Sequence, residues 1–160
     1  EDLIATVNGE EISQKSFDKY KVVLNQNNEY SDKEILNKMI EKRVLEDKAI
    51  SEGFIVSVEE VNAAVTQVKT ALQQDEEQYK FLKEYLSGLG ISEEQYWSEI
   101  VPEEYKQVLT VNKMYKSLRD EFIKNNNLTN PDEIKSKFDI YWDEYKNDLI
   151  SKADVQANIK

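Results

Sequence analysis

The sequence predicts a mainly α-helical protein of five to seven helices that form an elongated body, with a small antiparallel sheet joining the two ends of the chain. An Asn8-Gly9 pair between two short extended runs indicates a hairpin, because a type I′ turn requires positive φ at both central residues. Apolar and polar residues alternate strictly from Ala153 to Ile159, which predicts a half-buried strand. Between these strands, apolar residues recur at helical spacing.

Composition limits the classes of function. The 160 residues suffice for one domain with a sizeable core. Charged residues make up 33% of the chain and the formal net charge is -11, so the surface repels polyanions. No apolar run approaches the roughly 20 residues needed to cross a bilayer. We therefore expect no nucleic-acid partner and no transmembrane segment.

The sequence contains neither cysteine nor histidine. The first absence excludes disulfides, thiolate metal sites and cysteine nucleophiles. The second removes the usual general base near neutral pH and the commonest metal ligand. We expect no catalytic residue, no metal site and no cofactor. The chain starts at Glu1 without an initiator methionine or an apolar leader, which is compatible with the mature part of an exported precursor.

The first half of the chain predicts three helices with clear starting signals. Ser13 is a suitable N-cap for a first helix. A capping box at Ser31–Glu34 begins a second helix with a broad apolar face, which ends before Gly53. A second capping box, at Ser57–Glu60, begins a third helix, whose valines keep the helical period.

A glycine-containing bend and a proline divide the next region. Asp75 is expected to cap a short helix that ends at Gly88 and Gly90. The run from Ser92 to Gln95 repeats the capping pattern and introduces a further helix. Pro102 should kink or restart that helix, because proline has no amide hydrogen.

Two helices complete the chain before the final strand. A long helix is expected over Glu103–Asn125, and the asparagine run 125–127 ends it. Asn130 then caps a last helix over Pro131–Ser151, with proline at the first helical position.

The nine tyrosines and two tryptophans are either core or the lining of a peptide-binding groove. Five aromatic residues have core spacing: Phe17, Tyr115, Phe122, Phe138 and Trp142. Five others flank the glycine bend and the proline kink, where we expect less complete packing: Tyr79, Tyr85, Tyr96, Trp97 and Tyr105. These last five are the candidate peptide-binding residues, with core packing as the alternative.

The order of the motifs resembles the SurA/PrsA class of extracytoplasmic folding factors, over roughly residues 3 to 118. The matching segments are the hairpin Ile4–Ile12 followed by Phe17, the second helix Leu36–Ala49, the segment Gly53–Val61 that leads into the third helix, and the segment Gly90–Tyr96 that leads into the later helices. The resemblance implies a single SurA N-terminal-like chaperone domain, 1–160. Residues 1–26 and 131–160 then form a closing lobe with the terminal strands, and 31–125 form the helical body.

Members of that class commonly carry a parvulin-type prolyl isomerase domain between the long helix and the closing helix. Here residues 126–130 alone join those two helices, which leaves no room for a domain of about 90 residues. The parvulin site also relies on histidines, which this sequence lacks. The resemblance therefore implies the chaperone body without the isomerase.

The implied function is an extracytoplasmic chaperone that binds unfolded or newly exported polypeptides in a partly apolar helical cleft. It would be secreted or held at the cell surface, with a lipid anchor upstream of Glu1 as one arrangement. Two alternatives remain open. One is a prolyl isomerase family member or a fragment of one. The other is a helical adaptor or a homodimer formed by exchange of the terminal strand or the first helix.

Overall fold

The computed structural model describes residues 3–158 and confirms a mainly helical fold with a small antiparallel sheet. The elements are β1 (Leu3–Val7), β2 (Glu10–Ser13), α1 (Gln14–Leu24), α2 (Asp32–Ser51), α3 (Val58–Gln74), α4 (Glu76–Leu89), α5 (Glu93–Gln95), the π-helical turn η1 (Tyr96–Ile100), α6 (Val101–Asn125), α7 (Pro131–Lys152) and β3 (Val155–Ala157).

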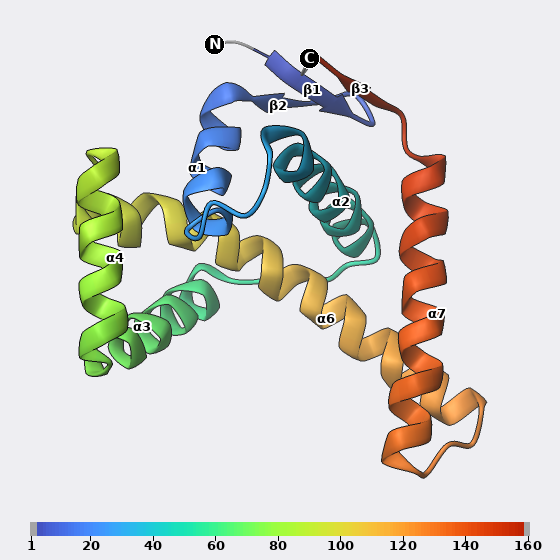
Figure 1. Ribbon diagram of the computed structural model, residues 1–160. Coiled ribbons are helices and arrows are strands. Elements are labelled where there is room, and N and C mark those ends of the chain that lie inside the picture. The colour runs from blue at the N-terminus through green and yellow to red at the C-terminus, as the bar shows by residue number, and fades with distance from the viewer. Residues whose placement is uncertain (1–2, 159–160) are drawn as a thin grey trace.

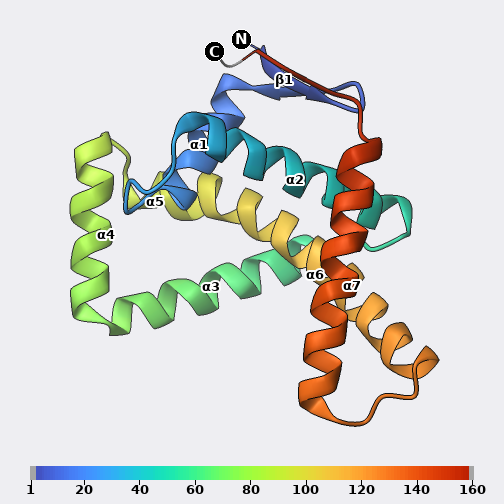
Figure 2. The same ribbon diagram turned by 45° about the vertical axis from the view of Figure 1, so that its right-hand side comes forward.

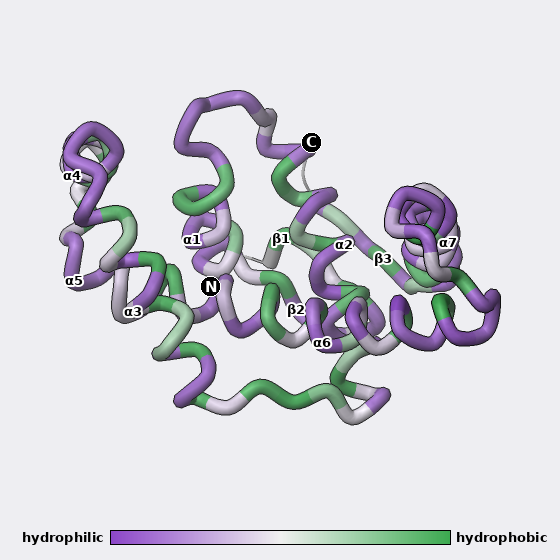
Figure 3. The backbone as a smooth tube through the Cα atoms, turned by 90° about the horizontal axis from the view of Figure 1, so that it is seen from below, coloured by the Kyte–Doolittle hydropathy of each residue, from purple (hydrophilic) through white to green (hydrophobic). Residues whose placement is uncertain are grey.

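The long helix α6 crosses the molecule and organises the rest (Figure 1). Helices α3 and α4 form an arm on one side, and α7 stands on the other (Figure 2). Seen from below, α4 and α7 lie at opposite ends with α1, α2 and α6 between them (Figure 3). The sheet covers α1 and α2 at the top, where the two ends of the chain come together (Figure 1).

The sheet has the strand order β2-β1-β3, and both pairings are antiparallel. Val7 pairs with Glu10 across the hairpin and with Val155 of β3 on the other side. Asn8 and Gly9 have φ values of 51° and 83°, as a type I′ turn requires. The predicted hairpin and the meeting of the two ends are both confirmed.

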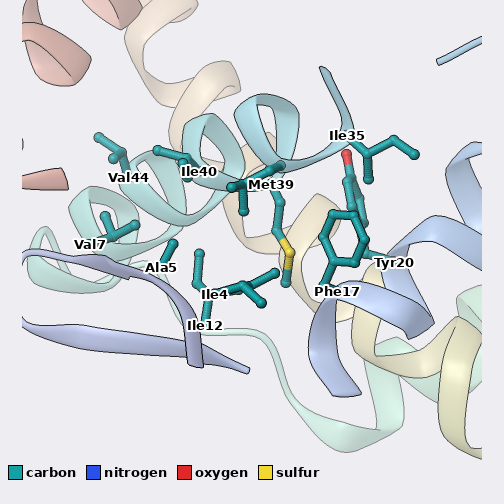
Figure 4. Packing of buried hydrophobic residues seen from close by; sticks show 11 residues of the cluster. Ile4, Ala5, Val7, Ile12, Phe17, Tyr20, Ile35, Met39, Ile40 and Val44 are labelled. Carbon is teal, nitrogen blue, oxygen red and sulfur yellow. The ribbon is translucent and has the colours of Figure 1, made fainter. Parts of the chain in front are cut away.

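The predicted half-burial of the last strand is wrong. All three residues of β3 are exposed, although Val155 shares the sheet face of its partner Val7. The reason is that β3 forms an edge of the sheet, and helix α2 covers β1 and β2 instead. Figure 4 shows Ala5 and Val7 beneath Ile40 and Val44 of α2. Ile159, which the prediction included, lies outside the described residues.

A pair of hydrogen bonds joins the hairpin turn to the end of the chain. The Asn8 amide donates to the Asp154 carbonyl at 2.7 Å, and the Asp154 amide donates to Asn8 Oδ1 at 2.9 Å. The asparagine therefore has two roles: it tolerates positive φ, and its side chain secures the segment that leads into β3.

Replacing Asn8 with glycine should lower the free energy of unfolding by about 1 kcal/mol more than replacing Asn127 with glycine. Both asparagines have φ near 50°, so both changes add the same backbone freedom to the unfolded chain. Only Asn8 loses a side-chain bond to the other end of the chain. Urea denaturation of the two variants measures the difference, and equal midpoints would contradict this role for the Asn8 side chain.

Every predicted N-cap accepts a backbone hydrogen bond, but two of the expected capping boxes are only half formed. Ser31 and Glu34 form the complete capping box. At Ser92 the hydroxyl accepts from the Gln95 amide without a returning bond from the Gln95 side chain. Ser57 accepts from the Glu60 amide at 3.1 Å, but the Glu60 carboxylate pairs with Lys113 of α6 at 2.8 Å and does not return to Ser57. The second capping box is therefore only half formed, because packing of α3 on α6 gives Glu60 a different partner.

The chain turns from the arm into α6 through a π-helical turn. Helix α4 starts at its Asp75 cap and continues through Gly88 to Gly90, which has a φ of 71°. The turn η1 immediately precedes α6, and Pro102 occupies the first turn of α6, where no amide donor is needed. The backbone stays helical from Glu93 to Asn125, so a π-helical turn precedes Pro102 and the predicted restart of the helix there is wrong.

The core consists of three clusters. The first joins the sheet to α1 and α2, the second joins α3, α4, η1 and the start of α6, and the third joins α2, α6 and α7. Phe17 and Phe138 are buried as predicted. Tyr115, Phe122 and Trp142 are only half-buried, so their prediction as full core is wrong. Helix α2 covers only part of the α6–α7 pair, and no other described element covers the rest of these three side chains.

Candidate functional site

A cleft of about 490 Å³ lies between α1, α2, α6 and α7. Its apolar lining consists of Leu24, Leu45, Val108, Val111, Tyr115 and Trp142, together with the ring of Tyr20. Charged and amide side chains surround this surface: Lys38, Glu41, Lys42, Gln107, Asn112 and Lys146. The cleft therefore combines apolar walls with polar groups that hydrogen-bond.

Helical spacing places these residues on a common surface. Val108, Val111 and Tyr115 recur at intervals of three and four residues on α6, and Trp142 and Lys146 are four residues apart on α7. Side chains at these intervals share one face of a helix. Each helix contributes one stripe, and the stripes converge on the cleft.

Aromatic contacts hold the α7 wall in place. The Tyr115 ring meets the rings of Phe138 and Trp142 edge-on, with both centroid distances 5.1 Å. Trp142 stacks on Tyr145 at 5.7 Å. Edge-on and stacked pairs stabilise by about 1 kcal/mol each beyond their buried area. The wall is thus built by packing between α6 and α7.

Ion pairs link the helices around the cleft. Lys146 of α7 pairs with Glu41 of α2 at 3.4 Å, and Lys42 of α2 pairs with Glu104 of α6. Lys42 also lies over the Tyr20 ring, 5.0 Å from its centroid. Lys38 lies over the Tyr30 ring, 4.8 Å from its centroid, and forms no ion pair among the described residues. With Glu104 included, three lysines and two carboxylates surround the cleft, so its rim is slightly cationic in a strongly acidic chain.

Tyr20 lies at the base of the cleft, where α1 meets α2 and α6. Its side chain is buried, and its hydroxyl has no hydrogen-bond partner among the described residues. Burial raises the pKa of Tyr20 far above its usual value, and the carboxylates of Glu104 and Glu41 raise it further. The hydroxyl is therefore a neutral donor throughout the physiological pH range.

Replacing Tyr20 with phenylalanine should leave the free energy of unfolding at pH 7 unchanged or raise it by about 1 kcal/mol, because a buried unpaired hydroxyl is removed. Replacing Tyr96 with phenylalanine should lower it by about 1 kcal/mol, because that hydroxyl accepts a bond from Gln26. Urea denaturation compares the two variants. An equal loss of stability of the two variants at pH 7 would contradict the conclusion that the Tyr20 hydroxyl is unpaired and the Tyr96 hydroxyl is hydrogen-bonded.

The same Tyr20 variant should also change the response to alkaline pH. The pKa of Tyr20 is higher in the folded protein than in the unfolded chain. The effect of this difference on the free energy of unfolding is fully present below about pH 10, and it is lost as pH rises above that value, because the unfolded chain then ionises more readily than the folded protein. Between pH 9 and about pH 11, the wild-type protein should lose more stability than Tyr20→Phe does. Urea denaturation at each pH measures the free energy of unfolding of both proteins, and parallel pH profiles of the wild-type protein and Tyr20→Phe would contradict this prediction.

The five sequence-predicted candidates lie on α4, on η1 and at the start of α6, and they do not line this cleft. Tyr96 and Trp97 are buried in the second core cluster, 6% and 8% exposed, with their rings edge-on at 4.9 Å. The expectation of less complete packing is wrong for these two, since η1 directs both rings into the core. Tyr79, Tyr85 and Tyr105 are half-buried. Peptide contact through the five residues stays a prediction.

Sequence reasoning missed the apolar surface of α6. Val108 and Val111 follow the same helical spacing as core residues, so their pattern does not distinguish a cleft from an interior. The one available signal is that α6 carries apolar residues on more than one face. The spacing of Tyr115 and Trp142 predicts core, whereas their half-exposed sides form the cleft wall.

Residues 3–158 also lack two other kinds of feature. No group of three or more histidine, cysteine, aspartate or glutamate residues is arranged to hold a metal ion in that part of the chain. None of its helices has the length and hydropathy that crossing a membrane requires.

The fold is a helical module with a surface cleft, and its terminal strands pair in one sheet. The chain belongs to the SurA-like N-terminal domain family, whose model matches residues 1–115. The match ends within α6, so the α7 wall of the cleft, with Trp142 and Lys146, lies beyond it. Comparisons with curated proteins and with solved structures gave no match.

Proposed function

We propose that this protein is an extracytoplasmic chaperone that holds unfolded or newly exported polypeptides in the cleft between α1, α2, α6 and α7. The cleft, with its half-buried aromatic and aliphatic lining, is the observation that carries the proposal. The SurA-like family supports a chaperone-like module in general, and its members are typically periplasmic or extracytoplasmic.

The size and chemistry of the cleft suit weak, reversible binding. A volume of about 490 Å³ holds a few apolar side chains of a client. Gln107 and Asn112 offer amide donors and acceptors to a client main chain, whatever its sequence. The net charge of -11 keeps the complex in solution and attracts basic clients over long distances.

The proposed activity includes no isomerase chemistry. The sequence has no histidine, on which the parvulin site relies, and only five residues join α6 to α7. A proline-isomerisation assay tests this part of the proposal. Acceleration above the uncatalysed rate would contradict it.

Suppression of aggregation tests the chaperone activity directly. A chemically denatured client is diluted into buffer with increasing amounts of this protein, and light scattering is followed. We expect suppression to begin near equimolar amounts, and an acidic protein of similar size without a cleft is the control. No suppression at a tenfold excess would overturn the proposal. Binding of a single folded partner without suppression would favour the adaptor alternative.

A further inference from the structure

Helix α4 carries an apolar stripe whose two outer residues are exposed and whose middle residue, Tyr85, packs against the second core cluster and α1. Phe81, Tyr85 and Leu89 recur every four residues, and Phe81 and Leu89 are 47% and 50% exposed. The rings of Phe81 and Tyr85 are parallel, with centroids 6.4 Å apart. Scattered exposed apolar residues are ordinary, but a stripe at helical spacing resembles a docking face.

The stripe borders a groove of about 550 Å³ between α4 and α1. Tyr85 and Leu89 line it on one side, Val22 lines it on the other, and Ile91 closes it beyond the end of α4. The Tyr85 hydroxyl donates to the Val22 carbonyl at 2.9 Å. This bond fixes the distance between the two helices, so the groove is formed before a partner arrives.

The groove is separate from the chaperone cleft. Tyr20 and Leu24 of α1 line the cleft, whereas Val22 lines the groove. Side chains two residues apart on a helix lie on different faces. Figure 3 places α4 and α7 at opposite ends of the molecule. A partner in the groove therefore leaves the cleft accessible.

The groove lining itself is balanced, because it contains Asp18 and Lys21, and Lys21 pairs with Asp32 at 2.8 Å. The net charge of the neighbouring arm therefore indicates which partner fits. Residues 58–100, which form the arm and the turn after it, contain nine carboxylates and three lysines. Their field attracts cations and repels acidic surfaces. A second copy of this chain would bring an equally acidic arm to the same place, so self-association through this face is disfavoured.

We propose that the groove between α4 and α1 docks a basic polypeptide segment that presents apolar side chains one helical turn apart. An amphipathic helix places its apolar face in such a groove through side chains at intervals of three and four residues. Its lysines or arginines are attracted by the net negative charge of the arm. This binding surface is additional to the chaperone cleft and does not depend on the proposed function.

Three matched peptides test the proposal on the full chain. The probe is a fluorescein-labelled peptide with leucines at helical spacing and lysines elsewhere. A second peptide replaces the lysines with glutamates, and a third replaces the leucines with serines. Fluorescence anisotropy should show that the first binds at least about tenfold more tightly than the others. Equal binding of the glutamate peptide, or no binding of the first, overturns the proposal.

Variants locate the binding surface. The double variant Phe81→Ala, Leu89→Ala should lower the affinity for the lysine peptide by about tenfold, because the peptide loses its contacts with two exposed apolar side chains. Ile140→Ala, at a residue of α7 that is 62% exposed, is the matched control and should leave the affinity unchanged. All three substitutions are at exposed positions, so the urea midpoints of the two variants should equal that of the wild-type protein, which verifies that both variants are folded. Equal effects of the two variants, or none from the double variant, overturn the proposal.

Two readouts separate the groove from the cleft. The double variant should still suppress client aggregation, and Val108→Glu in the cleft should still bind the lysine peptide. Loss of peptide binding in Val108→Glu would place the peptide in the cleft and overturn the groove proposal. Sedimentation of the wild-type protein tests the other occupant: a dimer that the double variant abolishes would show that a second copy covers the groove.

Discussion

Replacing Phe138 with alanine is expected to lower the free energy of unfolding by about 3–5 kcal/mol, the largest loss among the substitutions considered. Phe138 is 1% exposed, and its ring meets the rings of Tyr115, Phe122 and Tyr141 at centroid distances of 5.1, 5.6 and 5.7 Å. Truncation removes these contacts and leaves a cavity between α6 and α7. Few other contacts join the lower halves of these helices.

The expected consequence extends beyond stability. Tyr115 and Trp142 line the cleft and are packed against each other, and Phe138 supports Tyr115 from below. Without that support the α7 wall of the cleft should become mobile. Increased hydrogen exchange in α7, at temperatures well below unfolding, measures this change.

Ile140→Ala provides the control, because this residue lies on α7 two positions away and is exposed. Its effect on the free energy of unfolding should stay within about 0.5 kcal/mol. Urea denaturation compares the two variants under the same conditions. A loss below about 1 kcal/mol for Phe138→Ala would contradict the view that aromatic packing holds α7 on the body.

Local chemistry explains what the sequence predicts correctly. The Asn8-Gly9 turn, the Ser31 capping box and the Asn130 cap depend on residues within a few positions of one another. Such features are visible before any tertiary contact is known. They also determine where the helices begin and end, and the helix boundaries are therefore close to the expected ones.

The errors concern contacts between distant parts of the chain. Glu60 leaves its expected cap because Lys113 of α6 is a competing partner. Trp97 points into the core because a π-helical turn changes the direction of its side chain. Tyr115 and Trp142 are half-exposed because α2 covers only part of the α6–α7 pair and leaves the cleft open beside them. A spacing pattern shows which residues share a face, but not what covers that face.

Replacing Val108 with glutamate should remove most of the ability to suppress aggregation, raising the concentration needed for half-suppression by about tenfold. Val108 lines the cleft from α6, is half-buried and belongs to none of the three core clusters. A carboxylate at this position must be desolvated when an apolar client segment enters. The substitution changes the binding surface with little disturbance of the core.

Ile55→Glu is the matched control, because it adds the same charge at a residue that is 74% exposed and does not line the cleft. Both variants carry the same net charge, so any difference between them reflects position and not the long-range field. Suppression should be retained in Ile55→Glu and lost in Val108→Glu, with similar urea midpoints. Equal suppression by the two variants would show that clients bind outside the cleft, and equal loss would show that net charge controls the activity. Since the valine contacts a client only if the client enters between α6 and α7, this comparison tests the location of binding separately from the activity itself.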